Sequence, residues 1–341
     1  GNNAIGIYID NNSGVLVSDS KLNLAAGKID VGASENGIGV YANKATIIDS
    51  GSEITVGKNG IGIYAIDSDV TLAGITVNLF GDNALGLYID GATNFSGSGQ
   101  INISGKNVVL FNMLSSGTIL TNNFTVNSVA PGSSYTLGNL AGSTFEYGGA
   151  GHLASEGTLI NGKNSAILLN SASTITANPG ETHIGGIIVD GWYTGALPAG
   201  FTPGIEGENR GIITLGDASA GLIGRNGARL QNTGIITVGN SAEGMNASGA
   251  GSLAINKNSI TIGNNSQGIF SHDGDNINND TGGLITSGGA LSVGIFADNI
   301  SGGIINNGTI RLTGDKVIGI YATGASHKII DNNGLIEIGD S

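Results

Sequence analysis

The chain has 341 residues, of which 61 are glycine and only 4 are proline, and it contains no cysteine. Charged residues make up 11% of the chain, against roughly 25% in a typical globular domain, while 39% are hydrophobic, which argues against disorder. Acidic residues outnumber basic ones by 26 to 13, and no run rich in lysine and arginine occurs. This balance excludes a phosphate-binding surface, so we expect no nucleic-acid partner and no contact with an anionic membrane.

An internal repeat begins at the first residues of the chain. Its first motif is glycine or alanine followed by Ile-Gly-Ile-Tyr or a close variant, as at residues 60–64. From Gly39 to Gly86 and from Gly221 to Gly319, on the two sides of an irregular middle, the internal glycine returns at intervals of 23 to 26 residues. The copies lie at residues 4–8, 37–41, 60–64 and 84–88, and again at 243–245, 267–270, 293–296 and 318–321.

A second motif is a short alternating run that ends in glycine, such as Ile-Thr-Val-Gly at residues 54–57 and 236–239. A third, weaker apolar run separates the two motifs, as at residues 46–48 and 70–72. Alternation with period two and many β-branched residues predict strands rather than helices.

Three short strands per coil of about 24 residues, separated by Gly, Asn, Asp and Ser, predict an all-β fold. The expected architecture is a right-handed parallel β-helix, a solenoid of roughly 14 coils stacked about 4.8 Å apart. An antiparallel sandwich is the alternative, but hairpin turns would not preserve a three-strand period. Within the motif at residues 60–64, the alternation predicts that Ile61 and Ile63 share one face and point into the core.

The repeat divides the chain into three parts. Residues 1–111 and 209–341 are expected to form regular coils, and residues 112–208 to form irregular coils with a protruding loop at 190–208. All four prolines and the single tryptophan lie in this middle part. The distance from Gly186 to Gly221 is 35 residues, about 11 more than one coil, which predicts a loop that leaves the solenoid.

The loop is the candidate contact site for a partner. Aromatic side chains give a large contact area at small entropic cost, and their faces suit sugar rings. The predicted partner-binding residues are Trp192, Tyr193, Phe201, Asp190 and Glu206. The alternative is that the aromatic rings fold back over a coil and seal its apolar side.

Catalysis and metal binding find little support in the sequence, so we expect no enzyme activity and no cofactor. Stacked coils would bring Asp67 and Asp90 close together, as in a retaining glycosidase, but this position is also a corner where Asp is common. Residues 272–280 contain three carboxylates, yet their spacing departs from a calcium loop, and a solvated acidic corner is the expected interpretation. The four histidines have no metal-ligand spacing.

The paired motifs resemble the passenger repeats of very large type Va autotransporters of fusobacteria and related genera. The best copies are residues 54–65 and 312–322, and the resemblance covers about two thirds of the chain. It implies an adhesin on the cell surface, held in the outer membrane by a barrel domain outside this fragment. The implied partners are a host glycan, an immune receptor or another bacterium. A polysaccharide-processing β-helix enzyme and an inert stalk segment remain the alternatives.

Overall fold

The computed structural model describes residues 2–11, 20–91, 94–115, 119–130, 132–153, 157–177, 180–324 and 329–339. All regular structure in these ranges is β-strand, and the strands form a parallel β-solenoid of about 12 turns with roughly 25 residues each. The predicted β-helix is therefore confirmed. The turns are fewer than the expected 14 because the stretch between β19 and β20 and several long strands use additional residues. Within the described ranges, no helix is long and apolar enough to cross a membrane.

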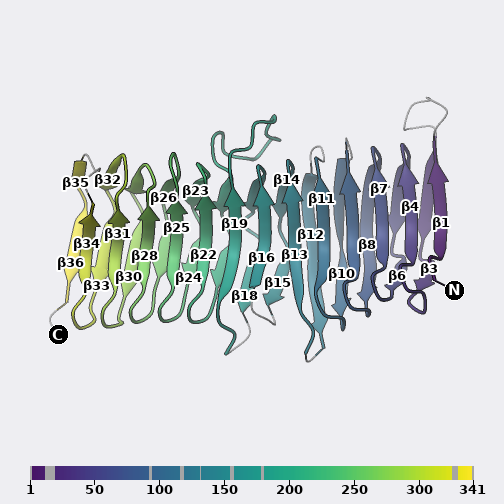
Figure 1. Ribbon diagram of the computed structural model, residues 1–341, viewed down its shortest axis with the longest axis horizontal. Coiled ribbons are helices and arrows are strands. Elements are labelled where there is room, and N and C mark those ends of the chain that lie inside the picture. The colour runs from purple at the N-terminus through teal and green to yellow at the C-terminus, as the bar shows by residue number, and fades with distance from the viewer. Residues whose placement is uncertain are drawn as a thin grey trace. The chain divides into compact units, whose positions relative to one another are not determined.

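The chain forms two compact units. Unit 1 comprises residues 1–155 together with 195–199, and unit 2 comprises residues 156–194 and 200–341. In each unit a strand pairs with its equivalent on the next turn, so the backbone hydrogen bonds run from turn to turn (Figure 1). Each turn thus depends on its neighbours, as in other repeat proteins.

Unit 1 contains two main sheets, and three of its strands merge the second and third strands of a turn. The first sheet consists of β1 (Ile5–Asp10), β4 (Ile38–Asn43), β7 (Ile61–Ile66), β9 (Leu85–Asp90), β11 (Val108–Leu114) and β13 (Tyr135–Ala141). The second consists of β2 (Lys21–Ala25), β5 (Thr46–Ser50), β8 (Asp69–Leu79), β10 (Asn94–Ile103), β12 (Ile119–Val129) and β14 (Thr144–Tyr147). The remaining strands are β3 (Lys28–Val31), β6 (Glu53–Val56) and β15 (Ala150–Leu153).

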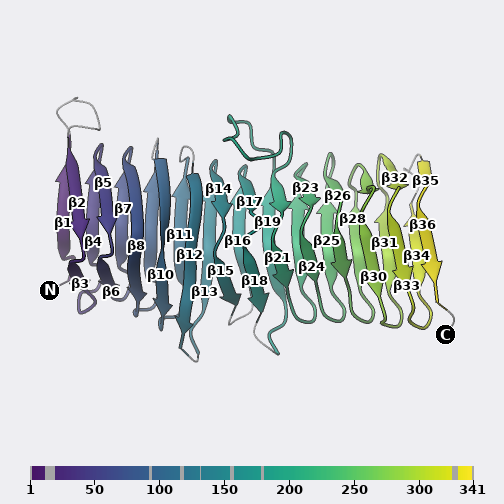
Figure 2. The same cartoon turned by 180° about the vertical axis from the view of Figure 1, so that it is seen from behind.

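Unit 2 has three separate strands on each turn, as the sequence predicts, and Figure 2 shows them from the other side. Its first sheet consists of β16 (Gly157–Lys163), β19 (Ile184–Asp190), β22 (Ala220–Arg225), β25 (Glu243–Ser248), β28 (Gln267–His272), β31 (Val293–Asp298) and β34 (Ile318–Thr323). The second consists of β17 (Ala166–Leu169), β20 (Gly207–Asn209), β23 (Arg229–Asn232), β26 (Leu253–Asn256), β29 (Ile277–Asn279), β32 (Gly303–Asn306) and β35 (Ile329–Asn332). The third consists of β18 (Thr174–Ala177), β21 (Ile212–Thr214), β24 (Ile235–Thr237), β27 (Ser259–Thr261), β30 (Leu284–Ser287), β33 (Thr309–Leu312) and β36 (Leu335–Ile338).

The strands of the first sheet depart from simple alternation at the motif glycine. In β7, Gly62 and Ile63 are both buried, whereas Ile61 is half-buried on the outer face with Tyr64. The prediction that Ile61 and Ile63 share an inward face is therefore wrong for Ile61. Two successive residues face inward, and in β7 the first is a glycine, because a Cβ on Gly62 would lie 2.5 Å from the carbonyl oxygen of Gly86 on the next turn. The same close approach occurs at Gly39, Gly86, Gly186, Gly221, Gly244, Gly268 and Gly294.

A line of asparagine side chains runs through the interior of unit 2. Each side-chain amide donates from Nδ2 to the Oδ1 of the asparagine on the following turn, over 2.6 to 2.9 Å. We call this line the asparagine ladder; its members are Asn209, Asn232, Asn256, Asn279, Asn306 and Asn332. All but Asn332 are fully buried. The ladder supplies partners for polar groups that would otherwise be buried without hydrogen bonds.

Aromatic rings fill the core of unit 1 where the repeat becomes irregular. Phe95, Phe111, Phe124, Phe145 and Tyr147 are buried, with neighbouring ring centroids 5.5 to 6.3 Å apart. The hydroxyl of Tyr147 donates to the carbonyl oxygen of Phe124 over 2.8 Å, and burial raises the pKa of this phenol. The large rings replace the isoleucine stacks of the regular turns, and the sequence period degrades accordingly.

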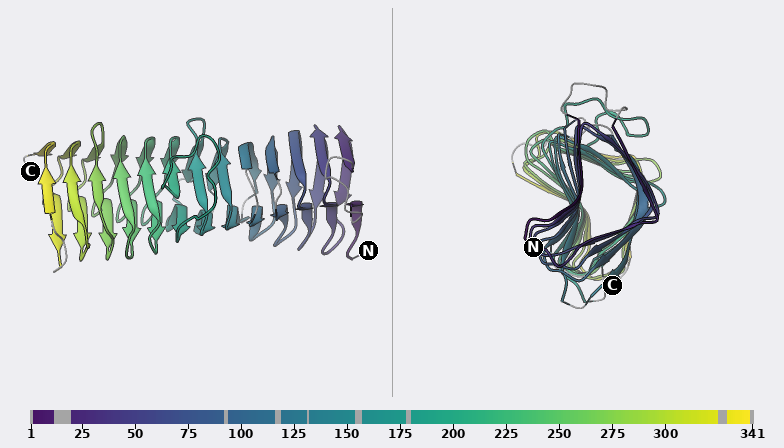
Figure 3. Two further views of the ribbon diagram at one scale, coloured as in Figure 1. Left: turned by 90° about the horizontal axis from the view of Figure 1, so that it is seen from above. Right: turned by 90° about the vertical axis from the view of Figure 1, so that its right-hand side faces the viewer.

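The outer face of the first sheet carries three rows of side chains, one position from each turn. A corner row precedes the strand and takes a left-handed backbone conformation, usually at asparagine, as at Asn36 and Asn59. An aliphatic row follows, and then an aromatic row, in which ring centroids lie 4.5 to 5.4 Å apart. The aliphatic row includes Ile38, Ile61, Leu85, Val293 and Ile318, and the aromatic row Tyr8, Tyr41, Tyr64, Tyr88, Phe270, Phe296 and Tyr321. Figure 3 shows how closely the turns within each unit repeat one another.

Candidate functional site

The predicted loop leaves unit 2 at the corner after β19 and returns at β20. No strand lies between Asp190, the last residue of β19, and Gly207, the first of β20. The chain turns away at Gly191, where φ is +82° and an added Cβ would lie 2.3 Å from Oδ1 of Asn164 on the preceding turn. The position of the insertion therefore agrees with the surplus of residues in the repeat spacing.

Trp192 rests on the corners of the two turns that follow it in unit 2. A Cβ on Gly227 would lie 1.9 Å from the indole Nε1, and one on Gly251 would lie 3.5 Å from Cζ2, so the ring covers both glycines. The guanidinium carbon of Arg229 lies 4.5 Å from the ring centroid, a cation–π contact. The side chain is nevertheless 47% exposed. The ring is thus fixed on one side and open to a partner on the other.

Glu206, at the end of the loop, contacts its beginning from the buried side. Its side chain is only 6% exposed, and its Oε2 accepts the backbone N–H of Arg229 over 2.8 Å. Burial raises the pKa of this carboxyl, and the backbone N–H groups of Arg229 and Tyr193 offset part of that increase. Glu206 therefore positions Tyr193 rather than presenting its charge to solvent.

A second carboxylate, Glu208, fixes the returning arm of the loop. Arg210 donates to both of its oxygens over 2.8 Å, and Gln231 donates to Oε1 over 3.1 Å. Nη2 of Arg210 also donates to the carbonyl oxygen of Gly200 and to Oγ1 of Thr202. Burial raises the pKa of Glu208, but the hydrogen bonds from Arg210 and Thr202 outweigh it, so the net pKa is lowered. This ionised pair ties the loop to β20.

The five predicted contact residues differ in what they offer to a partner. Trp192 is half-exposed, Tyr193 is partly exposed, and Phe201 is buried at 8% exposure. Asp190 accepts a hydrogen bond from Nδ2 of Asn226 over 2.6 Å, and Glu206 is buried. The exposed aromatic surface is therefore Trp192 with part of Tyr193, while Phe201 and Glu206 support the loop from within.

Sequence reasoning missed the residues that hold the loop, namely Glu208, Arg210 and Arg229. One signal for them was present: three of the four arginines of the chain lie between residues 210 and 229, directly after the loop. In a chain with so few charges, this grouping indicates a local function. Here that function is to hold an insertion against regular turns.

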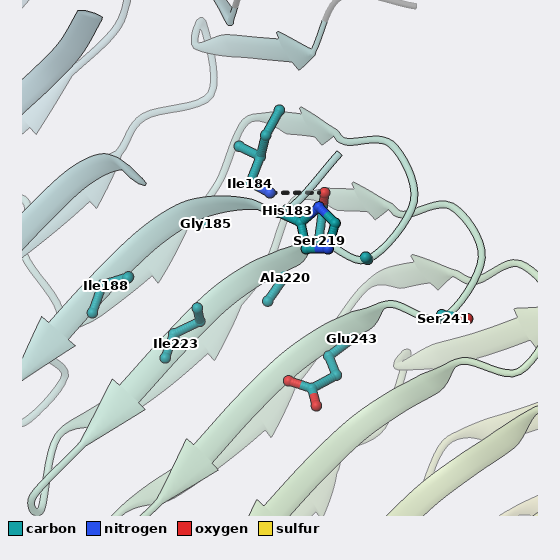
Figure 4. A pocket seen from close by; sticks show the side chains of 10 residues that line it. His183, Ile184, Gly185, Ile188, Ser219, Ala220, Ile223, Ser241 and Glu243 are labelled. Carbon is teal, nitrogen blue, oxygen red and sulfur yellow. Dashed lines mark hydrogen bonds between the residues drawn. The ribbon is translucent and has the colours of Figure 1, made fainter. Parts of the chain in front are cut away.

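The sequence also gave no indication of a hollow on the outer face of the first sheet of unit 2. We call it the sheet hollow; it has a volume of about 360 Å³ and lies over β19, β22 and β25. Figure 4 shows that the Glu243 carboxylate is directed across the sheet toward the strand that carries Ala220 and Ile223. Its lining comprises Gly185, Ala220, Glu243, Ile188 and Ile223, with His183, Ile184, Ala218, Ser219 and Ser241 at the corner.

Asp67 and Asp90, the carboxylates considered for catalysis, lie on neighbouring turns, and the backbone N–H of Asp67 donates to the carbonyl oxygen of Asp90 over 3.1 Å. Ile66, and not Asp67, pairs with Asp90 across β7 and β9, while Asp67 occupies the corner. Asp275 and Asp331 instead line a cleft of about 300 Å³ on the second sheet of unit 2.

The acidic segment at residues 272–280 lies at a corner of unit 2. The His272 ring lies between two carboxylates, with Nδ1 2.8 Å from Asp298 Oδ2 and Nε2 3.2 Å from Asp273 Oδ2. Asn299 donates to the other oxygen of Asp273 over 2.7 Å. In the part of the chain that the structure describes, no group of three or more His, Cys, Asp or Glu side chains is arranged to hold a metal ion.

Comparison with protein-family models, with curated proteins and with solved structures finds no match to this chain. What the fold and the loop define is a parallel β-solenoid with one stabilised aromatic insertion. Its function must therefore be inferred from these features.

Proposed function

We propose that this chain is a segment of a surface-displayed adhesin, and that it binds a cell-surface partner through the loop at 190–208. The observation that carries the proposal is the half-exposed Trp192 ring, fixed on Gly227 and Arg229 before any partner arrives. A ring held in place loses little conformational entropy on binding, and a few such aromatic residues usually dominate an interface. The regular turns then serve as a scaffold that displays the loop.

The proposal includes location and partner class. The resemblance of the repeats to autotransporter passengers supports display at the cell surface, held in the outer membrane by a domain outside this segment. The partner is a glycan or a receptor protein on a host cell or on another bacterium, and no catalysis is required. An aromatic face serves both kinds of ligand, since it packs against sugar rings and against apolar protein surface.

Replacing Trp192 with alanine is expected to weaken binding at least tenfold, about 1.4 kcal/mol. The circular dichroism spectrum should not change, because the ring lies outside the hydrogen-bonded turns. The measurement is a titration of labelled protein on epithelial cells, on cells of a second bacterium and on beads coated with galactose-terminated glycan. Phe80→Ala is the matched control, because Phe80 is also half-exposed, at 53%, but lies far from the loop in sequence.

Equal binding by the parent and Trp192→Ala would contradict the proposal. If that result came with a lower melting temperature, the ring would be a structural cover for the corner, as an inert stalk requires. Equal weakening by Phe80→Ala would show that the assay reports non-specific hydrophobic binding rather than binding at a defined site.

A polysaccharide-processing enzyme is the second candidate, favoured by the cleft that contains Asp275 and Asp331. Glycoside hydrolysis uses two carboxyl groups across a bound sugar. The test is release of reducing ends from neutral and acidic polysaccharides by the parent and by Asp331→Asn. Release that depends on Asp331 would support the enzyme function. Absence of release by the parent would contradict it.

A further inference from the structure

The sheet hollow lies where all three outer rows of the first sheet depart from their usual residues. In the aliphatic row, isoleucine, leucine or valine gives way to Gly185, Ala220 and Glu243, which pair with one another across three successive strands. The two small residues open the floor of the hollow, and the carboxylate closes one end. The next turn carries Gln267 at this position, and Val293 and Ile318 restore aliphatic residues on the two turns after it.

The two flanking rows also depart from their usual residues at these three turns. The aromatic row carries Ile188, Ile223 and Asn246 in place of tyrosine or phenylalanine. The corner row carries His183, Ala218 and Ser241, all with left-handed backbones, where asparagine is usual. The hollow is thus apolar on one side and polar at its corner. The corner row also departs at Leu291 and Lys316, and the aromatic row at Asn112 and Asn161, so what is particular to the hollow is Gly185 and Ala220 beside Glu243.

Glu243 carries a charge that the protein does not balance. Its Oε2 accepts a hydrogen bond from Nδ2 of Asn246 over 2.7 Å. Among the described residues, none of the six ion pairs includes Glu243. Burial raises the pKa of this carboxyl, as expected for a half-buried acid without a neighbouring cation. A positively charged ligand would supply the missing partner.

The polar corner of the hollow has further hydrogen-bonding capacity. Nδ1 of His183 lies 2.9 Å from Oγ1 of Thr182, so Nε2 is the ring nitrogen that can contact a ligand. Oγ of Ser219 accepts from the N–H of Ile184, as Figure 4 shows, and donates to the carbonyl oxygen of Asp217. Ser241 accepts from Nδ2 of Asn265 over 3.3 Å. His183 and Ser241 are therefore the corner groups that can turn toward a bound molecule.

We propose that the sheet hollow binds a primary ammonium group carried on a small carbon skeleton, with Glu243 as the counter-charge. The methylene or ring carbons of the ligand would lie on Ile188 and Ile223, above Gly185 and Ala220. A volume of about 360 Å³ is within the range of small-ligand sites. The net charge of −13 further favours a cationic ligand. This site is separate from the Trp192 loop and does not depend on the proposed adhesion.

Two sources offer this chemistry, a lysine side chain of a partner protein and an amino sugar. Ligand-observed NMR titrations distinguish them, with Nα-acetyl-lysine amide and glucosamine as probes. The neutral analogues, norleucine amide and N-acetylglucosamine, report binding that does not need the charge. We expect at least one cationic probe to bind, and its neutral analogue to bind at least tenfold more weakly.

Two variants locate the binding in the hollow. Glu243→Gln removes the charge and is expected to weaken the cationic probe at least tenfold. Ala220→Ile restores the residue type of the regular aliphatic row, so it should fill the floor, abolish binding and leave the fold intact. Glu53→Gln is the control, because Glu53 is an exposed carboxylate of unit 1 that already pairs with Lys28.

The outcomes separate clearly. Loss of binding in Glu243→Gln and Ala220→Ile, but not in Glu53→Gln, supports the site, and the stronger of the two probes identifies the source. The proposal is overturned if neither cationic probe binds to the parent, if a neutral analogue binds equally well, or if Ala220→Ile binds like the parent.

Discussion

Replacing Ile63 with aspartate is expected to unfold the turns around it. Ile63 has no exposed surface, and the new carboxylate would face an apolar stack without a cation or hydrogen-bond donor. A buried charge without a partner costs roughly 3–5 kcal/mol, a large part of the stability of an ordinary domain. The loss should spread to adjacent turns because each turn is stabilised mainly by its neighbours. Thermal and urea denaturation followed by circular dichroism measure the effect.

The matched control is Ile61→Asp, two residues earlier in the same strand. Ile61 lies on the outer face, so its carboxylate remains hydrated, and the cost should be about 1 kcal/mol or less. The pair of variants tests the inward step at Gly62 directly. Equal destabilisation by the two aspartates would show that both side chains point inward and that the alternation is regular.

Replacing Asn256 with aspartate should break the asparagine ladder while leaving the volume of the side chain nearly unchanged. The substitution keeps the oxygen that accepts from Asn232 but replaces the amide that donates to Oδ1 of Asn279 over 2.9 Å. At neutral pH the ionised carboxylate would face an acceptor in a buried site, and we expect a loss of roughly 3–5 kcal/mol. Asn258→Asp is the control, because Asn258 is exposed two residues away.

The same variant should recover stability in acid. Burial and the facing acceptor raise the pKa of the new carboxyl above its unfolded value, because both disfavour the ionised form. The protonated acid can donate to Asn279 and restore the ladder. The stability of Asn256→Asp relative to the parent should therefore be greatest below the unfolded pKa of about 3.9 and fall as pH rises through the folded pKa. Urea denaturation of both proteins at several pH values tests this, and a difference independent of pH would contradict it.

The sequence predicted the solenoid because its period is carried by single residues with strict steric roles. The motif glycine marks every regular turn, and the alternating runs mark the strands between. The inward step at Gly62 could not be seen, since glycine fits both a corner and a close approach of two backbones. The ladder was also hidden, because asparagine is common at corners and the spacing of Asn209, Asn232 and Asn256 reads equally well as a turn signal.

The position of the loop was predicted from the sequence, but the contacts that its side chains make were not. Counting residues between Gly186 and Gly221 located the loop, because an insertion changes the period wherever it occurs. Whether a ring faces solvent depends on distant partners, such as Arg229 for Trp192, and those contacts leave no periodic signal. The sheet hollow is harder still to predict, because it is formed partly by what is absent, the large side chains missing at Gly185 and Ala220.

The asparagine ladder also determines how this protein can vary. The five amides that donate within it all donate toward the following turn, so no member can reverse unless all of them reverse. If a complete turn with its own asparagine is added or removed, the turns that become neighbours can form the same hydrogen bond. A shift of one residue within a turn interrupts it. We therefore expect insertions to be tolerated at corners away from the ladder, as after Gly191, and the addition or removal of a complete turn to be tolerated better than a shift within a turn.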